Sequence, residues 1–224
     1  MAKTLAVLHT SMVFITVETL IQKIFKELLP DVRLINIVDD SLLPDVMATG
    51  VISADVIRRM CSYAVAAETA GADAIFSACS SLGPSINVAR ELVSIPVIKI
   101  DDAMAEKAAR ESERVGVLAT VPTTLGPTVD LINEKAAGMG KSVEVRRGLV
   151  EGAFEELMAG NREQHDTMVS EAAQALAKTV DLLVLAQASM TRLANSLSSD
   201  TGLPVMSSPR LGIEHVRRVL DEVA

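Results

Sequence analysis

Cys79 is the residue whose setting in the sequence best suits chemistry. It follows the apolar run Ala74–Ser77 and precedes Ser80 and Ser81, where we expect a helix to begin. The dipole at a helix start lowers the pKa of a thiol and stabilises the thiolate. In a dry pocket a thiolate is a competent base for a carbon acid, provided that donors hold the developing enolate charge. A lone buried cysteine is more often a small hydrophobic residue, and Cys61, on the apolar face of a predicted helix, fits that interpretation.

Small hydroxyl residues follow other predicted strands too, again where helices are expected to begin. Free N–H groups at a helix start, together with a Ser or Thr hydroxyl, bind a carboxylate without an arginine. Each such residue alone is better explained as a structural helix cap, but several that converge on one cleft favour a binding site. The candidates to hold carboxylate or enolate oxygens are Thr10, Ser11, Ser80, Ser81, Thr123 and Thr124. The candidates to line the wall of the site that the second half of the chain forms are Thr120, Gln187 and Ser189.

The sequence contains none of the common cofactor or metal signatures. No GxGxxG follows a strand, no P-loop is present, and GxSxG and HExxH are absent. The histidines His9, His165 and His215 are far apart in the sequence, so we predict no metal site and no cofactor. His9 is interpreted as a structural histidine rather than a helper acid. The other two are expected within helices, at the surface or between the two halves of the chain.

The composition excludes several classes of partner. The net charge is −8 and aromatic residues make up only 2%, whereas nucleic-acid binding calls for a basic face or aromatic stacking platforms. No run reaches the roughly 18 apolar residues of a membrane span, and the N-terminus lacks the pattern of a signal peptide. Two cysteines in 224 residues do not form a disulfide framework. We therefore predict a cytoplasmic protein with neither a nucleic-acid nor a membrane partner.

The second half of the chain repeats the pattern of the first. The segment 71–81 resembles the segment 180–190, and aligning Asp73 with Asp181 gives an offset of 181 − 73 = 108. Residues 6–10 resemble residues 116–120 at an offset of 117 − 7 = 110. Short apolar runs alternate with helical patterns, which is typical of parallel α/β units. The predicted strands are Thr4–Leu8, Val32–Val38, Ala74–Ser77, Val97–Ile100, Val115–Ala119, Val143–Arg147, Leu182–Ala186 and Pro204–Met206.

These patterns predict an α/β fold of two pseudo-symmetric lobes, each a parallel sheet flanked by helices, with the active-site cleft between them. The first lobe is expected to comprise residues 1–101 and a C-terminal helix over 209–224, and the second lobe residues 114–208. Residues 102–113 are expected to form a crossover helix. Ligands of α/β folds bind at the carboxyl ends of the strands.

Three helices show particular sequence signals. In the helix predicted over Ser53–Ala70, one apolar face carries Ile57, Cys61, Ala64 and Val65. Asn161 and Gln164 have the spacing of a capping box that opens a helix. Ser208 is predicted to cap a last helix that runs to about Val223.

Four segments together resemble the aspartate/glutamate/hydantoin racemase superfamily, which also includes arylmalonate decarboxylase and maleate isomerase. The segments are GADAIFSACSS at 71–81, IPVIKIDDAMA at 95–105, RVGVLAT at 114–120 and LVLAQ at 183–187. The resemblance covers nearly the whole chain. It implies cofactor-independent proton transfer at the carbon next to the carboxylate of a small acid, and it favours a homodimer or a larger homo-oligomer.

The family's racemases use one cysteine from each lobe, on opposite sides of the reacting carbon. Cys79 matches the cysteine of the first lobe. In the second lobe the ungapped register places Gln187 at the corresponding position, and a slip of one residue places Ala188 there. Neither side chain can act as the second acid, so the sequence departs from the two-cysteine pattern.

A single thiol leaves three functions open. The first is an isomerase of the racemase type in which Cys79 acts in both directions on a flattened intermediate. The second is a decarboxylase of a malonate-like diacid, in which Cys79 delivers one proton. The decarboxylase of this superfamily has its cysteine in the second lobe, so this chain would be a mirror arrangement that protonates the opposite face. The third is a carboxylate-binding protein without catalysis.

Overall fold

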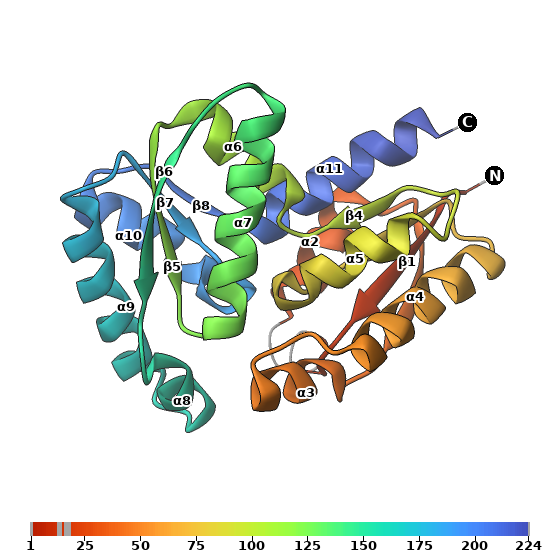
Figure 1. Cartoon of the computed structure of the whole chain (residues 1–224), viewed down its shortest axis with the longest axis horizontal. Coiled ribbons are helices and arrows are strands. Elements are labelled where there is room, and N and C mark those ends of the chain that lie inside the picture. The colour runs from red at the N-terminus through yellow and green to blue at the C-terminus, as the bar shows by residue number, and fades with distance from the viewer. Residues whose placement is uncertain (1, 13–14, 16–18, 224) are drawn as a thin grey trace. The chain divides into compact units, whose positions relative to one another are not determined.

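The computed structural model describes residues 2–12, 15 and 19–223. The chain divides into two compact units, Met1–Ile100 with Pro209–Ala224, and Asp101–Ser208. We call them the first and second lobes (Figure 1). The segment 102–113, expected as a separate crossover helix, contains α6 (Asp102–Glu111) and is grouped with the second lobe.

The first lobe contains, among the described residues, a four-stranded parallel sheet of order β2-β1-β3-β4. Its strands are β1 (Thr4–His9), β2 (Arg33–Val38), β3 (Ala74–Ser77) and β4 (Val97–Lys99). Its described helices are α2 (Leu20–Leu28), α3 (Leu42–Thr49), α4 (Ala54–Thr69), the 3-10 helix η1 (Ser80–Leu82), α5 (Gly83–Arg90) and α11 (Ser208–Glu222).

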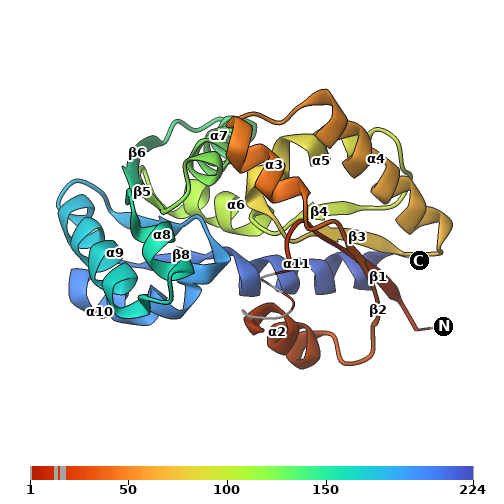
Figure 2. The same cartoon turned by 90° about the horizontal axis from the view of Figure 1, so that it is seen from below.

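Helices cover both faces of the first sheet (Figure 2). On one face, α4 and α5 share a buried core with Ala6 and Leu8 of β1 and Ile75 of β3. On the other, Phe25 of α2 meets Phe76 of β3 edge to face, with ring centroids 5.7 Å apart. Strands buried on both faces have near-continuous apolar sequences, which is why these segments could be recognised as strands.

Helix α11 packs in the first lobe next to α2. Arg210 pairs with Glu27 at 2.7 Å, and Arg217 pairs with Asp31 at 2.6 Å. These pairs are exposed and contribute little stability each. A closer contact between α11 and the rest of the lobe is at Gly212, where an added Cβ would meet the backbone oxygen of Ile100.

The second lobe repeats this plan, with a four-stranded parallel sheet of order β6-β5-β7-β8 in the described chain. Its strands are β5 (Arg114–Ala119), β6 (Glu144–Leu149), β7 (Leu182–Leu185) and β8 (Val205–Ser207). Its described helices are α6, α7 (Pro122–Gly138), α8 (Ala153–Met158), α9 (Arg162–Ala177), the 3-10 helix η2 (Ala188–Leu193) and α10 (Ala194–Thr201). Among the described helices, none combines the length and apolar character that a membrane crossing requires.

The two lobes match residue by residue in their central strands. β1 and β5 differ by 114 − 4 = 110 positions, and β3 and β7 by 182 − 74 = 108, the two offsets predicted from the sequence. Their backbone bonds repeat as well: Ala78 donates to Leu8 at 3.0 Å, and Ala186 donates to Leu118 at 2.9 Å. The predicted α/β fold is confirmed, and every predicted strand is present with its ends within two residues.

Three local predictions were wrong. Val65, placed on the apolar face of α4, is 42% exposed, because the buried stripe instead runs through Met60 and Ala67. Asn161 is the N-cap residue of α9, but the predicted capping bond is absent, since its side-chain amide donates to Glu156 at 2.7 Å. Ser208 is the first residue of α11 rather than a residue before it.

Candidate functional site

Cys79 lies two residues after the end of β3, at the carboxyl end of the first sheet. Its backbone is extended, with φ −138° and ψ 115°, and it immediately precedes η1. The side chain is 8% exposed and belongs to the core that contains Leu82 and Ile86. Strand alternation puts it on the same face as Ile75 and Ser77. The thiol is therefore in an enclosed, largely apolar position at the edge where α/β folds bind ligands.

The predicted hydroxyl residues of the first lobe surround the ends of β1 and β3. Thr10 follows β1 and is buried, and Ser11 next to it is partly buried. Ser80 and Ser81 form the start of η1 and are both buried. Because Leu8 of β1 pairs with Ser77 of β3, the sheet brings these two groups to the same edge.

His9 is the last residue of β1 and has one unsatisfied ring nitrogen. Its Nε2 lies 2.9 Å from Oδ1 of Asn36, an acceptor, so Nε2 carries the hydrogen and Nδ1 is the basic nitrogen. Burial lowers the pKa of His9, and the bond to Asn36 only partly offsets this. Nδ1 is buried and has no hydrogen-bond partner within the described structure. The imidazole is thus neutral near pH 7, and only half of its bonding capacity is used.

Ser77 and Lys99 are two polar residues of the first sheet that the sequence analysis did not single out. The Ser77 hydroxyl is buried without a hydrogen-bond partner in the described part of the chain. Lys99 pairs with Ser77 in the sheet and is only 4% exposed, and its Nζ donates to Asn87 at 3.2 Å. Lysines are almost never this buried without a partner. The available signal was a lysine inside an apolar run, Val97–Ile100.

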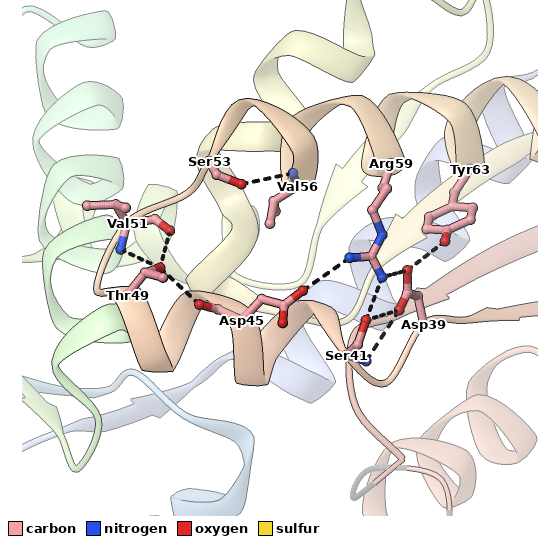
Figure 3. A network of polar contacts seen from close by, with 9 residues as sticks. All are labelled: Asp39, Ser41, Asp45, Thr49, Val51, Ser53, Val56, Arg59 and Tyr63. Carbon is pink, nitrogen blue, oxygen red and sulfur yellow. Dashed lines mark hydrogen bonds and ion pairs between the residues drawn. The ribbon is translucent and has the colours of Figure 1, made fainter.

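A polar network holds the loop that supports the end of β1 (Figure 3). Arg59 of α4 binds Asp39 and Ser41 in the loop before α3, and Asp45 in α3 at 3.1 Å. The Tyr63 hydroxyl donates to Asp39 at 2.6 Å. The backbone of the same segment carries the contact to β1, because the Asp39 amide donates to the His9 carbonyl at 3.0 Å.

Replacing Arg59 with alanine is expected to lower the free energy of unfolding by roughly 1–3 kcal/mol, because Asp39 loses a charged partner at a largely buried position. Burial alone would raise the pKa of Asp39, but bonds from Tyr63, Ser41 and Arg59 outweigh it and hold this pKa below its usual value. The stabilisation is therefore complete above the unfolded-state value of about 3.9 and is lost as the pH falls through the folded-state pKa. Urea unfolding at pH 7 and at pH 3.5 should show a smaller difference from wild type at the lower pH.

The matched control is Arg58→Ala, one residue earlier in α4. Arg58 pairs with Asp55, but the two side chains are 73% and 80% exposed. Its removal should change stability by no more than about 0.5 kcal/mol. Equal losses in the two variants would contradict a specific role for the network.

Gln187 takes the position in the second lobe that Cys79 takes in the first. Both residues follow the matching central strand, both have extended backbone, and both immediately precede a 3-10 helix. The strand offset gives the same result, since 187 − 79 = 108. Of the two registers left open by the sequence, the structure selects Gln187 over Ala188.

The side chain of Gln187 binds the start of α7. Its Oε1 accepts from the Thr120 amide at 2.6 Å, the Thr120 hydroxyl at 3.1 Å and the Val121 amide at 3.2 Å. The helix start that was expected to offer its N–H groups to a ligand thus already binds a neutral side-chain oxygen. The expected hydroxyl of Thr120 is likewise directed at Gln187.

The remaining candidates of the second lobe lie at the same edge. Thr123 and Thr124 are in the first turn of α7, and Ser189 is in η2, where it is buried. The structure therefore brings the candidates together as two groups, one at each sheet's carboxyl edge. Among the described residues, no group of three or more His, Cys, Asp or Glu side chains is placed to hold a metal ion.

His165 was expected at the surface or between the two halves of the chain, but it is fully buried inside the second lobe. Its Nδ1 lies 2.7 Å from Asp166, which also binds Arg192 of η2. Burial alone would raise the pKa of Asp166, but Arg192 and His165 together hold it below its usual value. This cluster fixes η2, the segment that follows Gln187, to α9.

Residues 15–216 match the model of a family described as Asp/Glu/Hydantoin racemase. The chain is similar to glutamate racemase from Francisella tularensis in complex with D-glutamate, with 18% identity, 99% of this chain and 81% of that chain covered, and a TM-score of 0.76. It is similar to a putative Asp/Glu racemase from Yersinia pestis, with 19% identity, 99% of each chain covered and a TM-score of 0.75. It is also similar to unliganded arylmalonate decarboxylase, with 16% identity, 99% and 94% covered, and a TM-score of 0.59.

At these identities the likeness to solved structures establishes the fold alone. No curated protein sequence matches the chain closely enough to count as a relative.

Proposed function

This chain belongs to the Asp/Glu/hydantoin racemase family, and we propose that it catalyses cofactor-independent proton transfer at the carbon next to the carboxylate of a small acid. Cys79 is the acid–base group of this reaction. The observation that carries the proposal is the position of Cys79, enclosed at the carboxyl end of β3 and directly before η1. Cys61, by contrast, lies in the packed face of α4, where burial raises the pKa of its thiol.

The internal repeat supports an activated thiol at position 79. In the second lobe, the amides of Thr120 and Val121 converge on the side chain of Gln187, the equivalent of Cys79. Thr10 and Ser11 are the equivalents of Thr120 and Val121, since 120 − 10 = 110. Backbone donors at this point of the fold favour a partly negative atom on the residue after the central strand. At position 79 that atom is the cysteine sulfur.

The substrate we propose is a small acid whose carboxylate is held by hydroxyl and amide donors. Thr10, Ser11, Ser80 and Ser81 are the proposed donors in the first lobe, and Thr123 and Thr124 those in the second. A related glutamate racemase was solved with D-glutamate, which supports an acid of this size. Proton removal gives an enolate, and hydrogen bonds to its oxygens lower the barrier.

A decarboxylase is the second candidate, and the observation that favours it is the glutamine at position 187. Decarboxylation needs only one acid: the bond to the departing carboxylate breaks, its electron pair stays on the α-carbon, and the Cys79 thiol gives that carbon a proton. Inversion by the two-base route, in which one group removes the proton and another returns it to the opposite face, needs a second acid, which Gln187 cannot supply. A malonate with one further α-substituent is the substrate class for this reaction.

Proton NMR in D₂O distinguishes these functions, using the wild-type protein with aspartate, glutamate, allantoin-type ureides and α-substituted malonates. Deuterium at the α-carbon without loss of carbon is the expected result for the isomerase-type reaction. A malonate converted to a singly deuterated monoacid with release of carbon dioxide would identify the decarboxylase. No reaction with any of these compounds, in a folded protein that still binds them, would overturn the catalytic proposal in favour of a carboxylate-binding protein.

A further inference from the structure

Gln187 has an amide whose orientation is fixed by chemistry. Its Oε1 lies within bonding distance of two backbone N–H groups, those of Thr120 and Val121. A backbone N–H only donates, so the atom that receives both bonds must be the oxygen. The amide cannot turn over without placing its own N–H groups against two other donors. Nε2 therefore points away from the start of α7.

The amino group of Gln187 has no hydrogen-bond partner in the described part of the structure, although its oxygen has three. The side chain is half-buried, and Nε2 is not enclosed. Two N–H donors are thus presented at the carboxyl edge of the second sheet. Polarisation of the amide by three bonds to its oxygen strengthens these donors.

We propose that Gln187 is an oriented hydrogen-bond donor whose Nε2 binds a carboxylate or enolate oxygen of the substrate, so that the second lobe holds the substrate without supplying an acid. This inference rests on the proposed function and adds a residue role to it. An amide N–H donates to an oxygen anion but does not release its proton near neutral pH. Protonation is then one-sided, and the products of exchange keep their configuration.

Gln187→Glu tests the donor, because glutamate has the same shape and one of its oxygens can accept the same three bonds. The other oxygen replaces Nε2 with a negatively charged acceptor, which repels a carboxylate. We expect the dissociation constant for malonate, measured by calorimetry, to rise by about tenfold or more. The matched control is Gln164→Glu, an exposed position in α9 of the same lobe with the same change of charge, and it should change malonate binding by less than about twofold.

A second measurement uses the wild-type protein and does not depend on the variant's folding. The side-chain NH₂ signals of Gln187 in a ¹⁵N–¹H spectrum, assigned by their loss in Gln187→Glu, should shift on titration with malonate and reach saturation with binding. Unmoved signals at saturating malonate would overturn the proposal, as would unchanged affinity in Gln187→Glu. A wild-type protein that binds no malonate at millimolar concentration would also overturn it.

Both measurements are repeated in a Cys79→Ala background, which lacks the proposed acid–base group. Binding that depends on Gln187 in both backgrounds, together with no exchange in wild type, would remove the proposed chemistry and leave the donor role in place. Exchange with wild type that proceeds unchanged in Gln187→Glu would remove the donor role and leave the chemistry.

Discussion

Alanine at position 79 is expected to reduce α-proton exchange by about 10²–10⁴-fold, the usual contribution of a positioned general acid or base. The sulfur is the proposed proton acceptor in the first lobe, and Cys79 lies two residues after the end of β3 and immediately before η1. Hydroxyls of Ser80 and Ser81 cannot replace it, because a serine is a far weaker acid and base near neutral pH. The measurement is the rate of deuterium entry at the α-carbon with the best substrate of the wild-type protein.

Cys61→Ala is the control for this experiment. Neither cysteine forms a disulfide, and each is 8% exposed, so the two variants remove a thiol of equal burial. Burial raises the pKa of Cys61, which keeps that thiol protonated and unreactive. Its loss should leave the exchange rate within about twofold at temperatures well below unfolding. Equal rates for Cys79→Ala and wild type, with malonate binding intact, would sink the assignment of Cys79.

The strands and their repeat could be predicted because parallel strands buried on both faces leave a strong apolar signal. Offsets of 108 and 110 read from the sequence are the offsets of β3 to β7 and of β1 to β5. Whether Gln187 or Ala188 is the equivalent of Cys79 could not be decided from one sequence, because the register is visible only once the strands are paired. Leu118 pairs with Leu185 in the second sheet as Leu8 pairs with Ser77 in the first, and this makes Gln187 the counterpart of Cys79 in the repeat.

Side-chain contacts between distant segments could not be predicted from the sequence. Gln187 lies 187 − 120 = 67 residues from the threonine it binds, and no local pattern encodes that bond. His165 resembles a surface residue in sequence, since polar residues surround it, but the fold turns it into the core of the second lobe. Lys99 lies in the segment 95–105, which carries part of the family resemblance, yet its burial depends on α5 packing over it.

A thiol at one position and an amide at its repeat have different consequences for the reaction. Two acid–base groups on opposite faces allow either configuration of the product, whereas one acid on one face, with the substrate held by a fixed donor, protonates that face alone. The three bonds to Gln187 Oε1 show that the glutamine is built into the second lobe rather than left as a loose replacement. The asymmetry of the proposed site therefore arises from a difference between otherwise matching strand ends.

Gly212→Ala is expected to lower the free energy of unfolding by at least about 2 kcal/mol, although alanine is the better helix former. A Cβ at position 212 would lie 2.4 Å from the carbonyl oxygen of Ile100 and 3.2 Å from its carbon. These are backbone atoms, so the clash can be relieved only by moving α11 or the end of β4. In a chain of this length the loss corresponds to a fall in Tm of about 4–8 °C.

Gly126→Ala is expected to change the free energy of unfolding in the opposite direction. Gly126 lies inside α7, and a Cβ there meets nothing within 4 Å, so alanine should stabilise the protein by about 0.5–1 kcal/mol. In Gly212→Ala, displacement of Ile100 has a second consequence. The Ile100 amide donates to the carbonyl of Ser77 at 3.0 Å, and Ser77 lies two residues before Cys79. Gly212→Ala should therefore also slow α-proton exchange at a temperature where it remains folded, whereas Gly126→Ala should not. Calorimetric melting and exchange rates of both variants test this. A Gly212→Ala protein as stable as wild type would contradict the close packing of α11 against the backbone of Ile100.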